Sequence, residues 1–175
     1  MPTFTAIFIT ALLLTTLIEL WLAIRHARHV RSNRDQVPND FATQIDLASH
    51  QKAADYTCAK TRFSYPSIIM HSLLLLIFTL GGGLNLISNF WTGWIENSIF
   101  HGMALILTTI FILSALEILF NYYRTFVIEA QFGFNKMSPT MFFADLIKQY
   151  SLGFILGGVL LFCMLWLMAK AGAYW

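Results

Sequence analysis

Five histidines are the residues whose chemistry would be most telling here, because histidine is a frequent zinc ligand. They are His26, His29, His50, His71 and His101. Metal-assisted peptide hydrolysis typically needs two histidines four residues apart on one helix, with a glutamate after the first to activate water. No histidine here has another four residues on, and none is followed by glutamate. The sequence therefore predicts no catalytic residue and no metal ligand, so the chain alone should bind no stoichiometric zinc and hydrolyse no peptide.

His71 and His101 each stand alone in an apolar run. A single histidine in such a run is more often a buried hydrogen-bonding residue than a ligand, and we interpret both in this way, with metal ligation as the alternative. Cys58 and Cys163 have no second cysteine or histidine at ligand spacing, so we expect two free thiols.

Glu19 and Glu117 are the sharpest polar features, because each is the single charge of a long apolar run. A charge at the bilayer centre costs about 2.5–3.5 kcal/mol, so such residues usually face water or a bundle interior. One interpretation is that both line the cytoplasmic part of a wet chamber. The other, favoured because both lie near the end of a run, is that they extend to the interface or pair with Arg25 or Arg124.

The densest group of charged and turn-forming residues is the stretch from Phe126 to Gln149, FVIEAQFGFNKMSPTMFFADLIKQ. Gly133 and Asn135 can both adopt left-handed backbone, which suits a tight turn. Ser138 before Pro139 is a good helix start, with the serine as cap. Apolar residues then recur at helical spacing, namely Phe142, Phe143, Leu146, Ile147 and Tyr150. The stretch therefore predicts an ordered turn followed by an amphipathic helix.

The elements that must position these residues are membrane helices. The chain is 57% hydrophobic and only 11% charged, whereas soluble domains carry about 25% charged residues. Four continuous apolar runs are long enough to cross a bilayer. They cover residues 4–24, 67–87, 99–121 and 151–169. We predict an all-α fold, a polytopic bundle of four transmembrane helices in a single membrane domain, residues 1–175. The net charge of +2 gives no sign of a nucleic-acid partner.

The orientation follows from lysine and arginine, which accumulate in cytoplasmic loops. The loop of residues 25–66 holds seven, the next loop none, the loop of residues 122–150 three, and the C-terminal end one. Both long loops are therefore predicted to be cytoplasmic, with the N-terminus and the C-terminus outside. In a bacterium the membrane would be the inner one. The first run is not expected to be a signal peptide, because no basic residue precedes it.

Two features are expected in the first loop. Arg25, Arg28, Arg31 and Arg34 recur every three residues, which would continue the first helix into the headgroup layer. Positive-inside anchoring is favoured over a specific phosphoinositide site. A cytoplasmic amphipathic helix is then predicted from Phe41 to Arg62, capped by Asn39 or Asp40.

The amino-acid sequences of two segments resemble those of a known family. They are QKAADYTCAKTRF, with Lys52, Tyr56, Lys60 and Phe63, and the second loop, with Phe126, Glu129, Phe132, Gly133, Phe134, Asn135, Lys136, Phe142, Phe143 and Asp145. Both resemble the membrane domain of the CAAX prenyl proteases of the zinc-metalloendopeptidase type. The resemblance covers about residues 47–148.

This resemblance implies a polytopic membrane protease in which seven helices ring a water-filled chamber. It also implies a zinc site on the cytoplasmic side, held by an H-E-x-x-H helix and a later glutamate. Since H-E-x-x-H is not found here, the chain looks like the first four helices, without the catalytic segment. Zinc is thus implied only for the full-length enzyme. The implied partners are the lipid bilayer, the catalytic part of the enzyme and a peptide or protein substrate.

The leading hypothesis is that the chain supplies chamber wall and a cytoplasmic docking surface. The docking loop would comprise Glu129, Phe132, Gly133, Phe134, Asn135, Lys136 and Asp145. For Glu129, a contact with the catalytic part and a salt bridge within the loop remain equally open. The alternative is a free-standing, non-catalytic membrane scaffold or binding protein of the same fold. A small transporter is disfavoured, because no span carries paired midplane charges.

Overall fold

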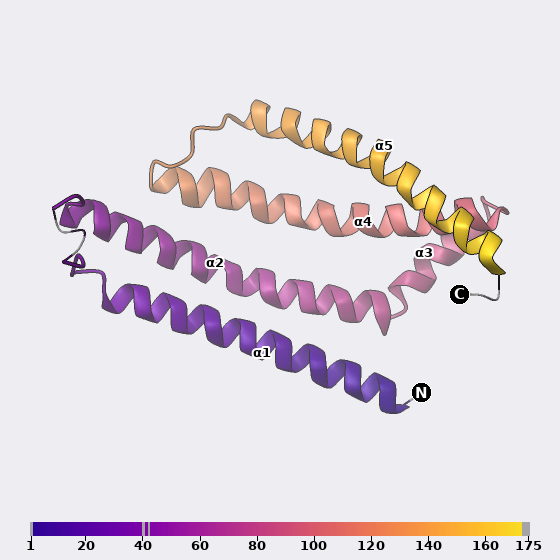
Figure 1. Ribbon diagram of the computed structural model, residues 1–175, viewed down its shortest axis with the longest axis horizontal. Coiled ribbons are helices and arrows are strands. Elements are labelled where there is room, and N and C mark those ends of the chain that lie inside the picture. Colours follow the sequence, from indigo (N-terminus) through magenta and orange to yellow (C-terminus); the bar gives the residue numbers. More distant parts are fainter. Residues whose placement is uncertain (1, 40, 42, 173–175) are drawn as a thin grey trace. The chain divides into compact units, whose positions relative to one another are not determined.

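The part of the chain described by the computed structural model, residues 2–39, 41 and 43–172, is helical throughout apart from its turns (Figure 1). The elements are α1 (Pro2–Ser32), α2 (Leu47–Thr79), α3 (Gly83–Thr92), α4 (Ser98–Tyr123), the π-helical turn η1 (Arg124–Glu129) and α5 (Pro139–Ala171). No strand occurs among these described residues. The predicted all-α class is therefore confirmed.

Four helical segments are long and apolar enough to cross a membrane. They are Thr3–Ser32, Leu47–Thr79, Ser98–Glu129 and Pro139–Ala171. At most 6% of the most apolar window in each is buried within the protein. Helices that are apolar on all sides and uncovered by protein need lipid as their solvent. Four span helices are therefore present as predicted; three of them extend past both ends of the apolar run that predicted them, whereas the second starts earlier than its run and ends within it.

The predicted amphipathic helix of the first loop is not a separate element, whereas the one after Ser138 leads into the fourth span as predicted. Residues 47–66 form the first half of α2, which continues without interruption to Thr79. The amphipathic stretch after Ser138 is likewise the first part of α5. The physical reason is that backbone hydrogen bonding does not stop where the apolar run stops. Pro66 lies inside α2 without ending it, as proline can within membrane helices.

The predicted cap of the first loop was also wrong. Asn39 lies in a turn well before the helix, and Asp40 is outside the described residues. Instead α2 begins after Asp46, whose Oδ2 accepts a hydrogen bond from the backbone N–H of Ser49 at 3.2 Å. Turns precede this start, and in one of them the Phe41 N–H donates to the Pro38 carbonyl at 2.9 Å.

The second apolar run is divided by glycines. The N–H groups of Leu80 and Gly81 both donate to the Leu76 carbonyl at 2.9 Å, which closes the last turn of α2. Gly82 then adopts a φ of 77°, and α3 starts at Gly83. A Cβ at Gly81 would lie 2.8 Å from the Ile77 carbonyl oxygen, so the helix end is built for glycine. The apolar run of residues 67–87 is thus two helices with a turn between them.

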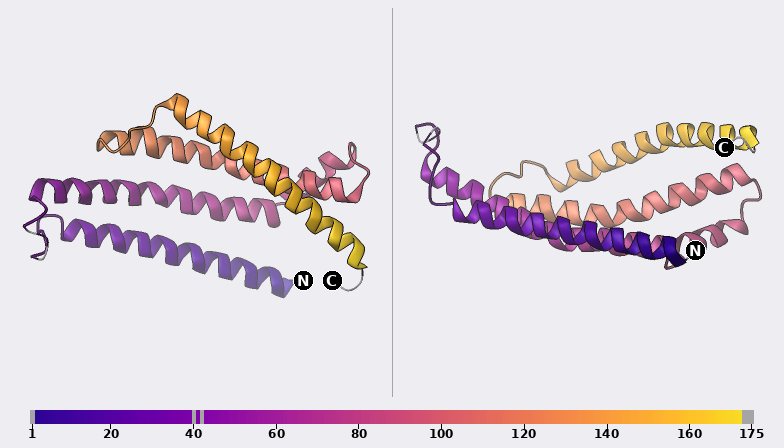
Figure 2. Two further views of the ribbon diagram at one scale, coloured as in Figure 1. Left: turned by 45° about the horizontal axis from the view of Figure 1, so that its top comes forward. Right: turned by 60° about the horizontal axis from the view of Figure 1, so that its bottom comes forward.

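The chain forms two compact units. The first comprises the described residues up to Leu75 together with Phe120–Lys136, and the second comprises Leu76–Leu119 together with the described residues from Met137 onward. In the first unit α1 lies beside α2 (Figures 1 and 2). The Thr16 and Ser72 hydroxyls are 2.6 Å apart, and the Cys58 thiol donates to the Ala27 carbonyl at 3.6 Å.

The second unit combines α3, α5 and most of α4. The Trp91 indole N–H donates to Thr108 Oγ1 at 3.0 Å, which ties α3 to α4. Helices α4 and α5 meet where the rings of Phe100 and Phe162 stack at 6.2 Å. There, a Cβ at Gly102 would come within 3.3 Å of a Leu165 methyl group, so glycine allows a close approach.

Candidate functional site

The loop after Glu129 packs on one face of α2. The ring of Tyr56 is met edge-on by Phe132, at 5.6 Å between centroids, and by Phe134, at 4.9 Å. Lys52 Nζ lies 5.3 Å from the centroid of Phe134, and Lys60 Nζ lies 5.9 Å from that of Tyr56. We name these five residues the loop–α2 cluster. It brings together the two segments that carry the family resemblance.

Local sequence explains both halves of the loop–α2 cluster. Lys52, Tyr56 and Lys60 are spaced four residues apart, so they share one face of a helix. On the loop side, Gly133 has a φ of 74°, as the sequence predicted, and its N–H donates to the Ala130 carbonyl at 3.0 Å. No described residue other than glycine has a positive φ, so Asn135 does not adopt the left-handed backbone expected for it.

The loop backbone is fixed by a single carbonyl at the end of η1. The N–H groups of Phe134 and Asn135 donate to the Glu129 carbonyl at 2.9 and 3.2 Å. A loop whose N–H groups are satisfied in this way is ordered before it meets any partner. The prediction of an ordered turn is confirmed by these hydrogen bonds.

The π-helical turn η1 directly precedes this loop. π-helical turns are rare, and they occur frequently at functional sites. Within η1, Ile128 is buried, and Arg124 Nε lies 3.9 Å from Glu129 Oε1. This distance is too long for a hydrogen bond, and Arg124 Nε is buried without a hydrogen-bond partner. Glu129 therefore has an ion-pair partner within its own turn.

Further aromatic contacts extend the packing of α2 beyond the loop–α2 cluster. Phe63 stacks on Tyr123 at 4.8 Å, with 22° between the ring planes, and approaches Phe120 at 5.6 Å. Tyr122 and Phe126 lie 4.6 Å apart on the neighbouring turns. Aromatic pairs at these distances stabilise a contact by about 0.5–1.5 kcal/mol beyond area burial.

The exposed residues of the loop define what it can offer to a partner. Phe134 keeps 48% of its surface exposed although it contacts Tyr56. Lys136 is exposed, whereas Phe132 and Asn135 are half-buried. An ordered backbone thus presents an apolar ring beside the Lys52 ammonium group.

Asp145, which was predicted to belong to the docking loop, lies on α5 in the second unit. It is exposed, and its Oδ1 lies 3.6 Å from Lys148 Nζ one turn on. The structure therefore does not gather it into the unit that contains the loop–α2 cluster. The predicted helix start nearby is confirmed, because Ser138 Oγ accepts the N–H of Met141 at 3.2 Å and Pro139 is the first helical residue.

Glu19 and Glu117 are both exposed on helices that could span the membrane. Glu19 belongs to α1 in the first unit, and Glu117 to α4 in the second. Among the described residues Glu19 makes no hydrogen bond or ion pair, and Arg25, its predicted partner in one interpretation, lies over the ring of Trp21 at 5.4 Å. Exposure of both carboxylates fits either of the interpretations that the sequence left open.

The donor groups of the described residues do not fit a zinc site. No three histidine, cysteine or acidic side chains among the described residues lie close enough to hold a metal ion. His71 Nδ1 bonds the Ser67 carbonyl at 2.8 Å, and His101 Nε2 bonds the Ser88 carbonyl at 3.0 Å. Both are hydrogen-bonded, as predicted, but neither is buried as predicted: His71 is exposed and His101 is half-buried. No catalytic step through a metal can be derived from these residues.

Hydrogen bonds between polar side chains join the ends of α1 and α2, and sequence reasoning missed them. We name the residues Arg34, Asp35, Gln51 and Asp55 the polar clasp. Arg34 donates to both carboxylate oxygens of Asp55, at 2.7 and 2.9 Å, and also to Asp35 at 3.0 Å. Gln51 reaches Asp35 at 2.9 Å. These hydrogen bonds raise the pKa of Arg34 above its ordinary value. The partners are too far apart in sequence for local spacing to reveal them.

The second unit contains an apolar groove of about 1090 Å³ between α4 and α5. Its walls include Leu107, Phe111 and Phe154, with Trp91 contributed by α3. Gln149 and Ser151 are among its few polar residues. The groove offers contact area rather than reactive groups.

Comparison with known proteins gives this geometry a context. Residues 26–175 match the family described as CAAX prenyl protease N-terminal, five membrane helices. The chain is 30% identical over 156 residues to "Probable CAAX prenyl protease 1" of Schizosaccharomyces pombe, covering 79% of this chain and 32% of that protein. It is 24% identical over 160 residues to CAAX prenyl protease 1 of Saccharomyces cerevisiae, covering 84% of this chain and 35% of that one.

The fold is likewise similar to a solved structure. The crystal structure of S. mikatae Ste24p superposes with a TM-score of 0.82 at 22% identity, over 93% of this chain and 39% of that one. The chain thus spans about a third of the length of the relatives it matches. The family match over residues 26–175 and the shared fold establish that this chain belongs to the CAAX prenyl protease N-terminal family, as an integral-membrane part.

Proposed function

We propose that this chain is the membrane-embedded N-terminal part of a zinc metalloendopeptidase, in which it supplies chamber wall and a docking surface for the catalytic part. Family membership supports the first half of this proposal. The observation that carries the second half is the loop–α2 cluster, where an ordered loop leaves Phe134 48% exposed. The zinc ligands and the contacts to a peptide or protein substrate would come from the remainder of the full-length enzyme.

Exposed aromatic surface on the ordered loop supports the docking surface. An exposed aromatic ring on an ordered loop loses contact with water when a partner covers it, and such anchors dominate interfaces. The neighbouring Lys52 and Lys60 have no acidic partner among the described residues, and their ammonium groups are held over aromatic rings. A partner with an apolar pocket rimmed by acidic groups would complement this surface.

The test compares Phe134→Ala with Phe41→Ala, since Phe41 is 50% exposed outside the loop–α2 cluster. Each change is made both in the full-length enzyme and in the 175-residue chain. Interface anchors typically contribute 2 kcal/mol or more, so Phe134→Ala should lower peptidase activity by about tenfold or more if docking limits it. Phe41→Ala should leave activity unchanged.

The thermal stability of the 175-residue chain separates docking from internal packing. If the loop docks the catalytic part, Phe134→Ala should lower this thermal stability by no more than Phe132→Ala does. Of these two variants, only Phe134→Ala should cause the large loss of peptidase activity. Full activity of the Phe134→Ala enzyme would contradict docking. A loss of activity that merely follows the loss of stability in both variants would show that the loop serves its own helices.

The chamber wall is the second part of the proposal. Glu19 and Glu117 are its candidate residues: both are exposed on span helices, and an ionised carboxylate in contact with lipid would be costly. We assign each to a water-filled space. Cysteines introduced at these two positions should react with a water-soluble maleimide in the full-length enzyme, and protection of both by the bilayer would refute the assignment.

A further inference from the structure

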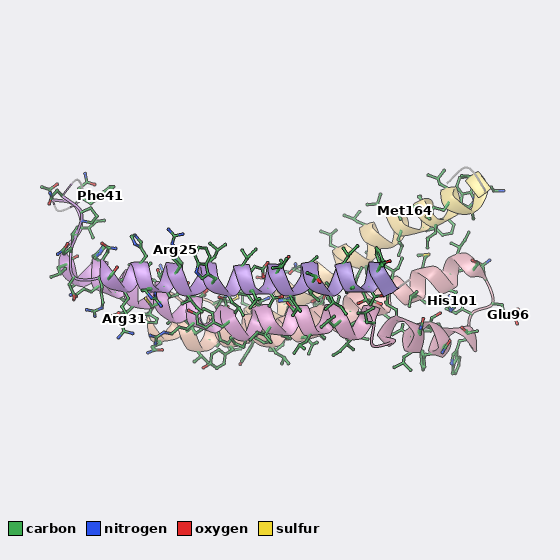
Figure 3. The ribbon with its side chains drawn as sticks, turned by 90° about the horizontal axis from the view of Figure 1, so that it is seen from below. Arg25, Arg31, Phe41, Glu96, His101 and Met164 are labelled. Carbon is green, nitrogen blue, oxygen red and sulfur yellow. The ribbon has the colours of Figure 1, made fainter. Side chains whose placement is uncertain are left out.

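The basic residues that follow the apolar part of α1 are not equivalent. Arg25, Arg28, Arg31 and Arg34 are spaced by three residues, and each such step turns the direction of the side chain by about 60° around a helix. Arg25 and Arg31 accordingly leave α1 on different sides (Figure 3). The stripe therefore winds around the helix rather than forming one basic face.

Two of the four arginines interact with the Asp55 carboxylate of the first unit, Arg34 by direct hydrogen bonds and Arg31 through its charge alone. Arg34 binds Asp55 through two hydrogen bonds and Asp35 through a third. Arg31 is close enough for its charge to act on the Asp55 carboxylate. The polar clasp thus compensates the charge at the far end of the stripe.

Arg25 and Arg28 remain, and they share a face with Trp21. The three residues stand at positions i, i+4 and i+7, which coincide on one side of a helix. The Arg25 guanidinium lies 5.4 Å from the centre of the Trp21 ring, and Trp21 is 57% exposed. Neither arginine contacts an acidic side chain in the described part of the chain, and both are exposed.

We propose that Trp21, Arg25 and Arg28 form a binding site for the phosphate of an anionic phospholipid. The apolar run ends at residue 24, so a rise of 1.5 Å per residue places both arginines within about 6 Å of its end, at headgroup level. Guanidinium groups bind phosphate oxygens bidentately, and tryptophan is enriched at the same depth. The occupant is a lipid rather than free phosphate because the site continues directly into the apolar face that acyl chains cover.

The experiment uses quenching of Trp21 fluorescence by brominated lipids in symmetric bilayers that contain the 175-residue chain. The difference between the wild type and Trp21→Phe isolates the signal of this tryptophan. Brominated phosphatidylglycerol is compared with brominated phosphatidylcholine, which gives a relative binding constant for the anionic lipid. Each arginine near a charged surface is worth about a fivefold change in binding, so the pair should give a preference of about 25-fold.

The variant Arg25→Gln/Arg28→Gln should reduce this preference to about one. The matched control Arg31→Gln/Arg62→Gln removes the same charge and should keep most of it, and Arg25→Lys/Arg28→Lys should keep part of it. Inorganic phosphate at the same concentration should not displace the lipid. Equal quenching by both lipids in the wild type, an equal loss in the control, or displacement by inorganic phosphate would each overturn the proposal. Circular dichroism of every variant confirms that it is folded.

Discussion

Gly133 shows how much of the loop–α2 cluster depends on a single backbone angle. Its φ of 74° allows the chain to turn so that Phe132 and Phe134 both reach Tyr56. The sequence pointed to this residue because only glycine adopts such an angle without cost. What the sequence did not show was the partner: nothing in the spacing of either segment says that the loop lands on Tyr56.

We predict that Gly133→Ala lowers the free energy of unfolding by about 1–2 kcal/mol, because a Cβ is strained at this backbone angle. Steric contact is not the reason, since the Cβ would meet only Lys52 Nζ at 3.7 Å. Gly93→Ala is the control, because Gly93 has a φ of −76° and open space around it. Thermal unfolding in detergent measures both. Equal stability of the two variants would show that the turn is not strained by alanine.

The polar clasp is a contact between residues that could not be predicted from the sequence. Arg34 and Asp55 form a bidentate ion pair, although they are 21 residues apart in the sequence. The spacing of the arginines predicts that Arg34 belongs to a membrane-surface stripe with three others, because spacing does not encode how α1 is aligned along α2. Pairing between helices depends on that alignment, which hydropathy does not encode.

At the scale of elements, hydropathy located the helices but not their ends. Three of the four apolar runs lie within single helices, and the run of residues 67–87 is divided between α2 and α3. Helices form in these runs because lipid requires every backbone group to be hydrogen-bonded within the protein. The ends depend on local hydrogen bonds instead. Asp46 caps the start of α2, and Gly82 ends the turn that leads to α3. Hydropathy instead places the ends of this apolar run at residues 67 and 87. The π-helical turn η1 has no sequence signal comparable to these.

Asp46 gives the start of α2 a dependence on pH. Hydrogen bonds from the Ser49 hydroxyl and from its backbone N–H hold the pKa of Asp46 below its ordinary value. A carboxyl whose pKa is lower in the folded chain contributes stability above its unfolded pKa and loses it as the pH falls through the folded pKa. The cap should therefore weaken only below about pH 3.9, the ordinary aspartate value.

Hydrogen exchange of the Ser49 amide measures this cap. Its protection factor should be constant at neutral pH, fall in the acid range, and become independent of pH in Asp46→Asn, where the amide oxygen still accepts. The control is the cap of α4, in which Asn97 Oδ1 accepts the N–H of Ile99 at 3.0 Å and carries no titrating group. Acid sensitivity of the Ile99 amide, or none at Ser49, would contradict the prediction.

At the scale of the whole molecule, the distribution of charge predicts the orientation in which the chain crosses the membrane. Loops of residues 25–66 and 122–150 hold seven and three basic residues, and the connection before α4 holds none. The structure adds that the connection between α3 and α4 is a short exposed turn, with Glu96 at its surface (Figure 3). Positive loops stay in the cytoplasm, so this turn should lie outside.

The prediction is tested by labelling single cysteines with an impermeant maleimide in intact cells. The background is Cys58→Ser/Cys163→Ser, because both native thiols are free. Glu96→Cys is preferred to a change at Asn97, since the Asn97 side chain caps α4. We expect labelling of Glu96→Cys before permeabilisation and of Gln44→Cys only after it, because moving the seven basic residues of the first loop across the membrane would oppose the positive-inside preference. The reverse pattern would place both long loops outside. It would also place the docking loop on the side of the membrane opposite to the zinc site that the family resemblance implies.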